Sequence, residues 1–317
     1  MNFDFSEFLE LEQTADGDFV SGKNGVTKIL TPVDRKSEFI FIGASVFVKI
    51  YSAIGGSVLY QLRKPVFQPK AEAILMDLDG TSVQSEEFWV WIIQRTMQQL
   101  IGNSGFQLSE EDIPFVSGFS VSEHLQYCID KYAPGQKIEQ ARRFYHEITA
   151  YEMDEILKGR GNQHAFRPVN HLKEFLLTLK QEGIKIGLVT SGLYSKAMPE
   201  IVAAFRTLQL GDPLEFYDAI ITAGQTFVPG KQSGTLGELC AKPHPWLYAE
   251  TAQVGLGISK ESTGVLGIED SSAGVMSVAL AGYPVIGMEG GNIHAAGLDG
   301  LLYRKSHDLL DVLECIL

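Results

Sequence analysis

From about residue 71 onward, short apolar runs alternate with longer amphipathic segments, and this alternation restricts the fold more than any other feature of the sequence. Three of the runs are typical of strands, because each is mainly apolar and ends in polar side chains: AILMD (73–77), IKIGLVTSG (184–192) and GVLGIEDS (264–271). Residues 169–183 have the apolar spacing of an amphipathic helix. Strands that alternate with helices predict an α/β fold, with a Rossmann-like parallel sheet and helices on both of its faces.

A long helical stretch interrupts this pattern after the first strand. Residues 85–165 carry apolar residues at helical spacing, and the stretch opens with a serine and two glutamates, which is typical of a helix start. We therefore expect a helical insert over residues 85–165 within an α/β core formed by residues 71–84 and 166–317. Residues 1–70 precede this core as an N-terminal extension, whose fold the sequence does not define. The oligomeric state is open as well.

The composition argues against several classes of protein. A net charge of −13 over 317 residues is unsuited to nonspecific binding of nucleic acid, which needs a basic surface. Cys128, Cys240 and Cys315 are far apart and show no CxxC spacing, which argues against a disulfide scaffold or a zinc site. The N-terminus is acidic and lacks the basic-then-apolar pattern of a secretory signal. Together these features favour a cytoplasmic protein.

Residues 39–60 allow two interpretations. The segment is mostly apolar and has the length of a membrane-spanning helix, which needs about 20 apolar residues. Lys49 would then lie near the middle of the membrane, where a charge is energetically costly. We therefore favour a segment of the N-terminal extension that packs against the main domain, and membrane contact through residues 39–60 is the less favoured alternative.

Polar residues collect at the ends of the predicted strands and at the start of one later helix. These residues are Asp77, Asp79, Thr190, Ser191, Gly192, Lys242, Glu269 and Asp270. Ligands of parallel α/β sheets bind where the carboxyl ends of the strands meet. If the predicted strands are neighbours in one sheet, these side chains converge on a single cleft.

The chemistry of such a cluster indicates phosphoryl transfer. Carboxylates gathered in one place repel one another unless a cation lies among them, and hard oxygen ligands suit Mg²⁺, which also bridges to phosphate. Lys242 supplies a point charge for phosphate oxygens, while Thr190 and the backbone N–H groups of the Ser191–Gly192 turn supply donors. A carboxylate nucleophile that faces an electrophile held by a lysine and a metal ion forms a phosphoryl-transfer site. The sequence therefore predicts Mg²⁺ as cofactor and a small phosphorylated metabolite as ligand.

The same residues form the motifs of a known family. The sequence resembles the haloacid dehalogenase (HAD) superfamily, whose four motifs occur in order: DLDGT (77–81), Thr190 at the end of IGLVT, Lys242 in KPHP, and EDSSAG (269–274). The resemblance extends from about residue 71 to the C-terminus. The helical insert lies where the family carries its type 1 cap, and this favours the branch of phosphoglycolate phosphatase and β-phosphoglucomutase.

The resemblance implies a role for each acid. Asp77 would be the nucleophile that becomes an aspartyl phosphate. Asp79 would protonate the leaving oxygen and then activate water. Asp77 and the main-chain carbonyl of Asp79 would also contact Mg²⁺, and Asp270 would hold the ion with the assistance of Glu269.

Three positions favour a phosphatase within this branch. Dehalogenases and phosphonatases of the superfamily lack an acid at the position of Asp79, so its presence favours phosphate esters. Trp89 stands where the mutase has a histidine, and Val121 stands where the mutase has a phosphate-binding arginine. We therefore predict a Mg²⁺-dependent phosphoric monoester hydrolase. A β-phosphoglucomutase-like sugar phosphomutase and a non-catalytic phospholigand-binding module are the alternatives.

The predicted cap contains candidate substrate contacts at Glu86, Trp89 and Ser120. Each of these side chains fits two interpretations, because it would serve equally well in packing or on a solvated helix face. The sequence therefore does not name the substrate.

Overall fold

The computed structural model describes residues 3–51, 56–115, 121–162, 165–224 and 240–317. The chain divides into two compact units. The first comprises Met1–Ser82, Val169–Tyr194 and Asp212–Leu317, and the second comprises Val83–Pro168 and Ser195–Gly211. The chain thus leaves the first unit twice, directly after Ser82 and directly after Tyr194.

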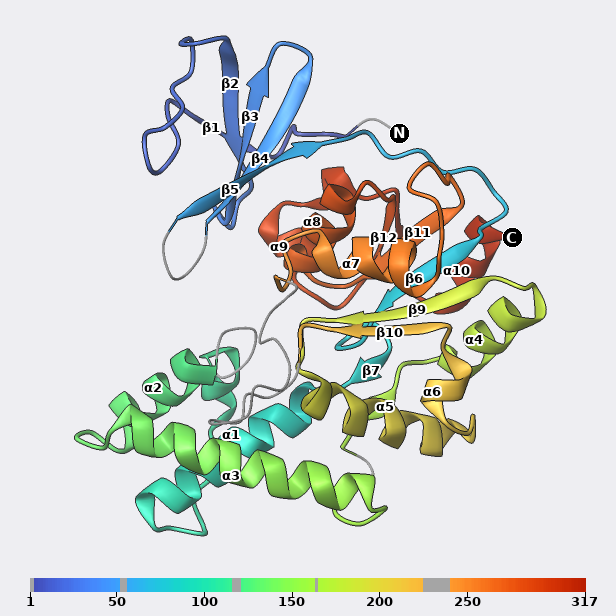
Figure 1. Cartoon of the computed structure of the whole chain (residues 1–317). Helices are drawn as coiled ribbons and strands as arrows, with labels where there is room; N and C mark the ends of the chain where they lie inside the picture. The colour runs from blue at the N-terminus through green and yellow to red at the C-terminus, as the bar shows by residue number, and fades with distance from the viewer. Residues whose placement is uncertain (1–2, 52–55, 116–120, 163–164, 225–239) are drawn as a thin grey trace, which may run out of the picture. The chain divides into compact units, whose positions relative to one another are not determined.

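The first unit is built around a parallel sheet of six strands in the order β10-β9-β6-β11-β12-β13 (Figure 1). Its strands are β6 (Ala73–Asp77), β9 (Lys185–Thr190), β10 (Ala219–Thr222), β11 (Val265–Glu269), β12 (Val285–Met288) and β13 (Arg304–Ser306). β6 and β11 are buried along their whole length, which explains why they are continuous apolar runs rather than alternating ones. This sheet confirms the α/β fold predicted from the alternation of strands and helices.

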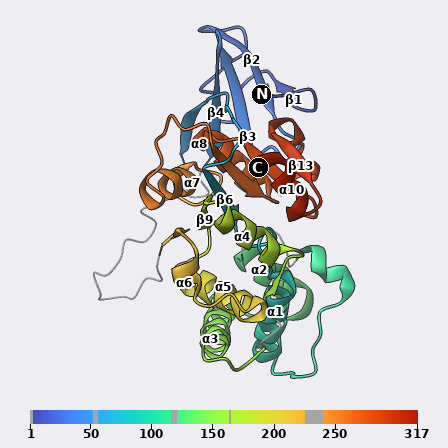
Figure 2. The ribbon, with the colours of Figure 1, turned by 90° about the vertical axis from the view of Figure 1, so that its right-hand side faces the viewer.

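Helices flank both faces of this sheet, with α7 and α8 on one face and α4 and α10 on the other (Figures 1 and 2). The helical segments are α4 (Leu172–Gln181), α6 (Pro213–Phe216), α7 (Trp246–Glu250) with the π-helical turn η2 (Thr251–Gly255), α8 (Ser272–Ala281), α9 (Ile293–Ala296), the 3-10 turn η3 (Asp299–Leu301) and α10 (Leu309–Ile316). Ser271 caps α8, because its side chain accepts a hydrogen bond from the Gly274 N–H. The cap fixes the start of α8 directly after the acids that end β11.

The strand order reverses at β6. From this strand the chain continues to β9 and β10 on one side, whereas β11, β12 and β13 lie on the other side. Such a reversal opens a crevice at the carboxyl ends of the central strands. Asp77, Thr190 and Glu269 are the last residues of the three central strands, so the fold places them at this crevice.

The N-terminal extension forms a second sheet, which is antiparallel and has five strands in the order β1-β2-β3-β4-β5. These strands are β1 (Leu9–Leu11), β2 (Val26–Thr31), β3 (Ser37–Ile42), β4 (Ser45–Tyr51) and β5 (Ser57–Leu62). Phe39, Val48 and Leu62 share one buried cluster with Leu247 of α7 and Val275 of α8. One face of the extension is therefore packed on the α7–α8 side of the core.

The apolar segment 39–60 belongs to β3, β4 and β5, with residues 52–55 outside the described part of the chain. No helix within the described residues has the length and apolar character to cross a membrane. Lys49 is buried, and its Nζ lies 2.7 Å from Asp18 Oδ2 and also contacts Asp16. The charge that weakens the membrane interpretation is thus neutralised within the extension itself.

The second unit is mainly helical. Its elements are α1 (Glu86–Ile101), the 3-10 helix η1 (Glu110–Phe115), α2 (Val121–Tyr132), α3 (Ile138–Leu157), most of α5 (Tyr194–Leu208), and a short ribbon of β7 (Val83–Gln84) with β8 (Arg167–Pro168). The Arg206 guanidinium of α5 donates to the carbonyl oxygens of Ile156 and Leu157, each at 2.5 Å. These bonds tie α5 to the end of α3, although α5 lies far from the other helices in the sequence.

Candidate active site

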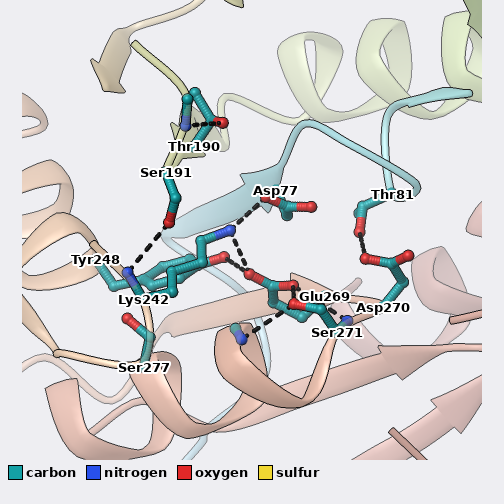
Figure 3. A network of polar contacts seen from close by, with 12 residues as sticks. Asp77, Thr81, Thr190, Ser191, Lys242, Tyr248, Glu269, Asp270, Ser271 and Ser277 are labelled. Atoms are coloured by element: carbon teal, nitrogen blue, oxygen red, sulfur yellow. Dashed lines mark hydrogen bonds and ion pairs between the residues drawn. The ribbon is translucent and has the colours of Figure 1, made fainter. Parts of the chain in front are cut away.

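Three carboxyl groups meet at the carboxyl ends of β6 and β11 (Figure 3). Asp77 ends β6, Glu269 ends β11, and Asp270 follows it. The two strands pair in parallel with Met76 opposite Ile268, so the residues that come next lie side by side. One carboxylate oxygen of each acid lies within 4.8 Å of the others. The structure thus brings together acids that are far apart in the chain.

The side-chain amine of Lys242 lies between two of these acids. Its Nζ contacts the Asp77 carboxylate and lies 2.6 Å from Glu269 Oε1. The side chains of Lys242 and Asp77 are 7% exposed and that of Glu269 is fully buried, so solvent screens these charges weakly. The backbone N–H of Lys242 donates to Ser191 Oγ at 3.1 Å, which ties the lysine to the turn after β9.

Burial and repulsion shift the pKa values in this cluster. Burial, and then the charge of Glu269, raise the pKa of Asp77 well above its ordinary value, against the opposing effect of Lys242. The same two causes raise the pKa of Asp270 to about 7. Burial alone would lower the pKa of Lys242, but the charges of Asp77 and Glu269 outweigh it and raise that pKa. Lys242 therefore stays charged at neutral pH, and the acids still carry uncompensated repulsion.

The cluster fits a hard divalent cation. Carboxylate oxygens are the ligands that Mg²⁺ prefers in proteins, and Asp77, Glu269 and Asp270 present them within one small space. Asp79 is half-buried nearby, and its charge contributes to the raised pKa values of both Asp77 and Asp270. A divalent cation would relieve the repulsion that one lysine leaves uncompensated.

The Glu269 carboxylate is held from several sides. The Tyr248 hydroxyl donates to Oε1, and Ser271 Oγ donates to Oε2 at 3.1 Å (Figure 3). Gly274 leaves the space for this carboxylate, since a Cβ at that position would overlap with it. Tyr248 was not predicted from the sequence, because a tyrosine within an apolar helix has no pattern that separates it from core residues.

The Asp270 carboxylate is supported by the first motif. Thr81 Oγ1 donates to Asp270 Oδ1 at 3.4 Å. Gly80 has a φ of +82°, and a Cβ there would overlap with the Asp270 carboxylate. The Gly-Thr pair was visible in the sequence as part of DLDGT. Only the fold shows that Thr81 contacts an acid 189 positions later in the chain.

The turn after β9 lies beside the acids. Val189 pairs with Asp77 across β9 and β6, so Thr190 follows at the same edge of the sheet. Thr190 is buried, and its Oγ1 accepts a hydrogen bond from the Gly192 N–H at 2.9 Å. Ser191 is exposed and bonds the backbone of Lys242. The predicted phosphate-binding residues and the predicted acids thus occupy one edge of the sheet.

The candidate substrate contacts belong to the second unit. Glu86 is exposed at the start of α1. Trp89 is half-buried against Phe166, and the Lys196 ammonium lies 4.1 Å from the centre of its indole ring. Ser120 lies outside the described residues. The roles of these three positions stay predictions.

Comparison with known proteins agrees with the motifs and with the sheet that positions them. The family model described as haloacid dehalogenase-like hydrolase matches residues 74–288. The chain belongs to this family. The resemblance predicted from the four motifs is thereby confirmed, and the match spans both the acids and the helical region between the first two motifs of this hydrolase family.

The curated relatives that match this HAD-family chain do so over less than half of its length. Pyrophosphatase PpaX of Listeria welshimeri is 28% identical over 130 residues, which is 41% of this chain and 52% of that protein. The chain thus spans about half the length of the curated relatives it matches.

Solved structures resemble the chain over a larger part of its length. A predicted phosphoglycolate phosphatase from Haemophilus somnus has a TM-score of 0.58 and 17% identity, and covers 78% of this chain and 98% of its own. A putative β-phosphoglucomutase from Thermotoga maritima has a TM-score of 0.55 and 20% identity, and covers 78% of this chain and 100% of its own. At these identities the likeness establishes the fold alone.

Proposed function

We propose that this protein is a phosphatase that hydrolyses a small phosphorylated metabolite, with Asp77 as the nucleophile and Mg²⁺ as the cofactor. One observation carries the proposal: Asp77 is buried beside Lys242, within 4.8 Å of the other two acids of the cluster. A carboxylate held next to a fixed positive charge is suited to attack a phosphoryl group that the same charge attracts.

The reaction would proceed in two displacements at phosphorus. A carboxylate oxygen of Asp77 attacks the phosphorus atom, the bond to the leaving oxygen breaks, and Asp79 gives its proton to that oxygen. Asp79 then takes a proton from a water molecule, whose oxygen attacks the aspartyl phosphate. The second step releases inorganic phosphate and restores the carboxylate of Asp77.

The remaining residues would bind and orient the phosphoryl group. Lys242 is charged and buried, so its ammonium would act on phosphoryl oxygens with little screening. The Thr190 hydroxyl and the backbone N–H groups of Ser191 and Gly192 would donate to the same oxygens. Glu269 would keep Lys242 in place, since its carboxylate is already held by Tyr248.

Asp77, Asp79, Glu269 and Asp270 are the residues that would hold Mg²⁺. When bound, the ion would neutralise the negative charge that the acids and a phosphoryl group bring together. Residues 85–165, which belong to the second unit, would then serve as the cap, with Glu86, Trp89 and Ser120 as candidate contacts to the rest of the substrate. Cys128, Cys240 and Cys315 are free thiols, which suits the reducing cytoplasm that we propose as the location.

The names of the relatives define the first test panel. They include a pyrophosphatase, a phosphoglycolate phosphatase and a sugar phosphomutase, so the panel contains pyrophosphate, small phosphorylated acids and sugar phosphates. Release of inorganic phosphate is measured with Mg²⁺ and with EDTA, for the wild type, for Asp77→Asn, and for Asp130→Asn, which removes an exposed acid of α2.

If the protein is a phosphatase, phosphate release will require Mg²⁺, will disappear in Asp77→Asn and will persist in Asp130→Asn. Isomerisation of a sugar phosphate in the presence of a sugar bisphosphate would instead identify a phosphomutase. Binding of phosphorylated ligands without turnover of any of them would identify a non-catalytic module.

A further inference from the structure

The N-terminal extension reaches the segment that carries Lys242. Tyr60 lies on β5, an edge strand of the antiparallel sheet. Its hydroxyl lies 2.8 Å from Nδ1 of His244, and the two rings meet edge to face with their centres 5.8 Å apart. The centres of the Tyr60 and Trp246 rings lie 6.4 Å apart, and these two rings also meet edge to face. A residue of the extension thus contacts the chain two positions beyond Lys242.

Hydrogen bonds hold the segment from Ala241 to His244, which contains Lys242. The His244 carbonyl oxygen accepts from Ser277 Oγ of α8 at 2.5 Å, and the His244 N–H donates to the Ala241 carbonyl at 3.1 Å. Before His244, the Lys242 N–H donates to Ser191 Oγ. The backbone from 241 to 244 is therefore held by the turn after β9 and by α8, and the His244 ring is held by Tyr60.

Burial favours the uncharged forms of both members of this tyrosine–histidine pair. Burial raises the pKa of Tyr60, so its hydroxyl is protonated at neutral pH. Burial lowers the pKa of His244, so its imidazole is neutral at the same pH. In either tautomer of a neutral imidazole the bond joins two uncharged groups, with the phenol as donor or as acceptor, so it does not depend on a charge on either partner.

The position of Lys242 matters because its amine contacts two buried acids at once. Glu269 Oε1 lies 2.6 Å away and Asp77 is in contact on the other side. Buried electrostatic interactions of this kind depend steeply on distance, and a displacement of about 1 Å in an active site lowers rates by as much as about 100-fold.

We propose that the N-terminal sheet is a positioning element for Lys242, and that Tyr60 acts through His244 to hold the lysine segment in place. The extension is then part of the working enzyme rather than an appendage to the core. Tyr60 is a positioning residue, since it contacts His244 and not the acids. The inference rests on the proposed function for its kinetic readout, and on the binding of inorganic phosphate for a readout that needs no turnover.

The test compares two substitutions that each remove one tyrosine hydroxyl from the same sheet. Tyr60→Phe keeps the ring contacts with His244 and Trp246 and removes the hydroxyl, with its bond to Nδ1 and its weaker interaction with Trp246. Tyr51→Phe is the matched control, because the Tyr51 hydroxyl donates to Glu38 Oε2 at 2.5 Å within the extension. Both variants remain half-buried aromatic residues on adjacent strands. The melting temperature, kcat, KM and the Kd of inorganic phosphate in the presence of Mg²⁺ are measured for each.

We expect Tyr60→Phe to lower kcat by about 5- to 20-fold and to weaken phosphate binding by about 3- to 10-fold, with a smaller change in KM. Tyr51→Phe should lower the melting temperature at least as much and leave kcat and phosphate binding at wild-type values. A third variant, His244→Phe, should lose as much as Tyr60→Phe, and the double variant should lose no more than either single one, since both remove the same bond.

Equal kcat and equal phosphate affinity in Tyr60→Phe and Tyr51→Phe would overturn the inference. So would additive losses in the double variant, which would mean that Tyr60 and His244 act separately. A wild-type protein that binds phosphate but hydrolyses no ester removes the proposed function and leaves the positioning role to be judged by the phosphate affinities. A wild-type protein that neither binds phosphate nor turns over any ester removes both.

Discussion

Lys242 Nζ lies 2.6 Å from Glu269 Oε1, and both side chains are almost completely shielded from solvent. The same amine contacts Asp77, the acid at the end of the neighbouring strand. A lysine so placed has two effects. It offsets part of the repulsion among the buried acids, and it presents a positive charge where a phosphoryl group would meet Asp77.

Replacement of Lys242 by methionine should therefore affect both activity and stability. We expect kcat to fall by about 100-fold or more, because a buried charge that stabilises the transition state is lost. We also expect a loss of about 3 kcal/mol in the free energy of unfolding when EDTA is present, since removal of one partner leaves buried acids uncompensated. The stability loss should shrink in excess Mg²⁺. Urea unfolding with and without Mg²⁺ measures it.

Lys180→Met is the control for this substitution. Lys180 also forms an ion pair with an acid, Asp218, at 2.8 Å, but it is far more exposed than Lys242, with 32% of its side chain accessible. Surface ion pairs contribute at most about 1 kcal/mol, so this variant should keep its activity and nearly all of its stability. A Lys242→Met variant that retains wild-type kcat would exclude a phosphate-binding role for the lysine.

Tyr248→Phe tests the residue whose hydroxyl donates a hydrogen bond to Glu269. The substitution removes the hydroxyl that donates to Oε1 and leaves the buried ring in place. We expect a loss of about 1 kcal/mol in stability and a decrease of about 3- to 10-fold in kcat, because the carboxylate that positions Lys242 becomes less constrained. Tyr283→Phe, another buried tyrosine, should keep its kcat. Equal kcat values for the two variants would show that the Tyr248 bond has no part in catalysis.

The acids and Thr190 of the site were visible in the sequence because each stands at the end of a strand or directly after it. Asp77, Thr190 and Glu269 each terminate an apolar run, and parallel strands bring such ends to one edge. Tyr248 was invisible, since its hydroxyl points at an acid that only the fold places beside it. Sequence patterns thus identify residues whose position in an element is diagnostic, and they miss those defined by contacts between elements.

The same distinction applies to the fold. The α/β core follows from its alternating strands and helices, whereas the N-terminal sheet does not show the alternation of a half-exposed strand. Its two faces are both apolar, with Phe39 and Val48 in the cluster on the core side and Ile29 and Ile40 in a separate cluster. Residues 39–60 therefore look like one continuous apolar segment. In α5, buried residues surround Pro199 and obscure the helical pattern.

Gly80→Ala should lower activity strongly, and comparison with a second glycine shows why. A Cβ at Gly80 would overlap with the Asp270 carboxylate, and the residue has a φ of +82°. Gly183 has a similar φ of +70°, but a Cβ there would meet nothing within 4 Å. Alanine at either position strains the backbone by about 1 kcal/mol, so both variants should lose a similar part of their stability from that cause.

Only Gly80→Ala should also displace the acid, and we expect its kcat to fall by about 100-fold or more while Gly183→Ala keeps wild-type activity. Calorimetric titration with Mg²⁺ should show weaker binding for Gly80→Ala alone. Wild-type Mg²⁺ affinity and kcat in Gly80→Ala would mean that Asp270 does not need its present position for either property.

The raised pKa of Asp270 predicts how stability depends on pH when no metal is bound. Its pKa rises from an ordinary value of 3.8 to about 7 in the folded protein, so folding takes up a proton between these values. The stability that this group contributes is therefore fully present below about pH 4 and is lost as the pH rises through about 7.

In EDTA, the free energy of unfolding of the wild type should fall from about pH 5 to about pH 8 relative to Asp270→Asn, whose side chain does not titrate. Saturating Mg²⁺ should flatten the difference, because a bound cation favours the ionised carboxylate. Urea denaturation across this range measures both curves, and a wild-type stability that rises with pH relative to Asp270→Asn in EDTA would contradict the close packing of acids at the ends of β6 and β11.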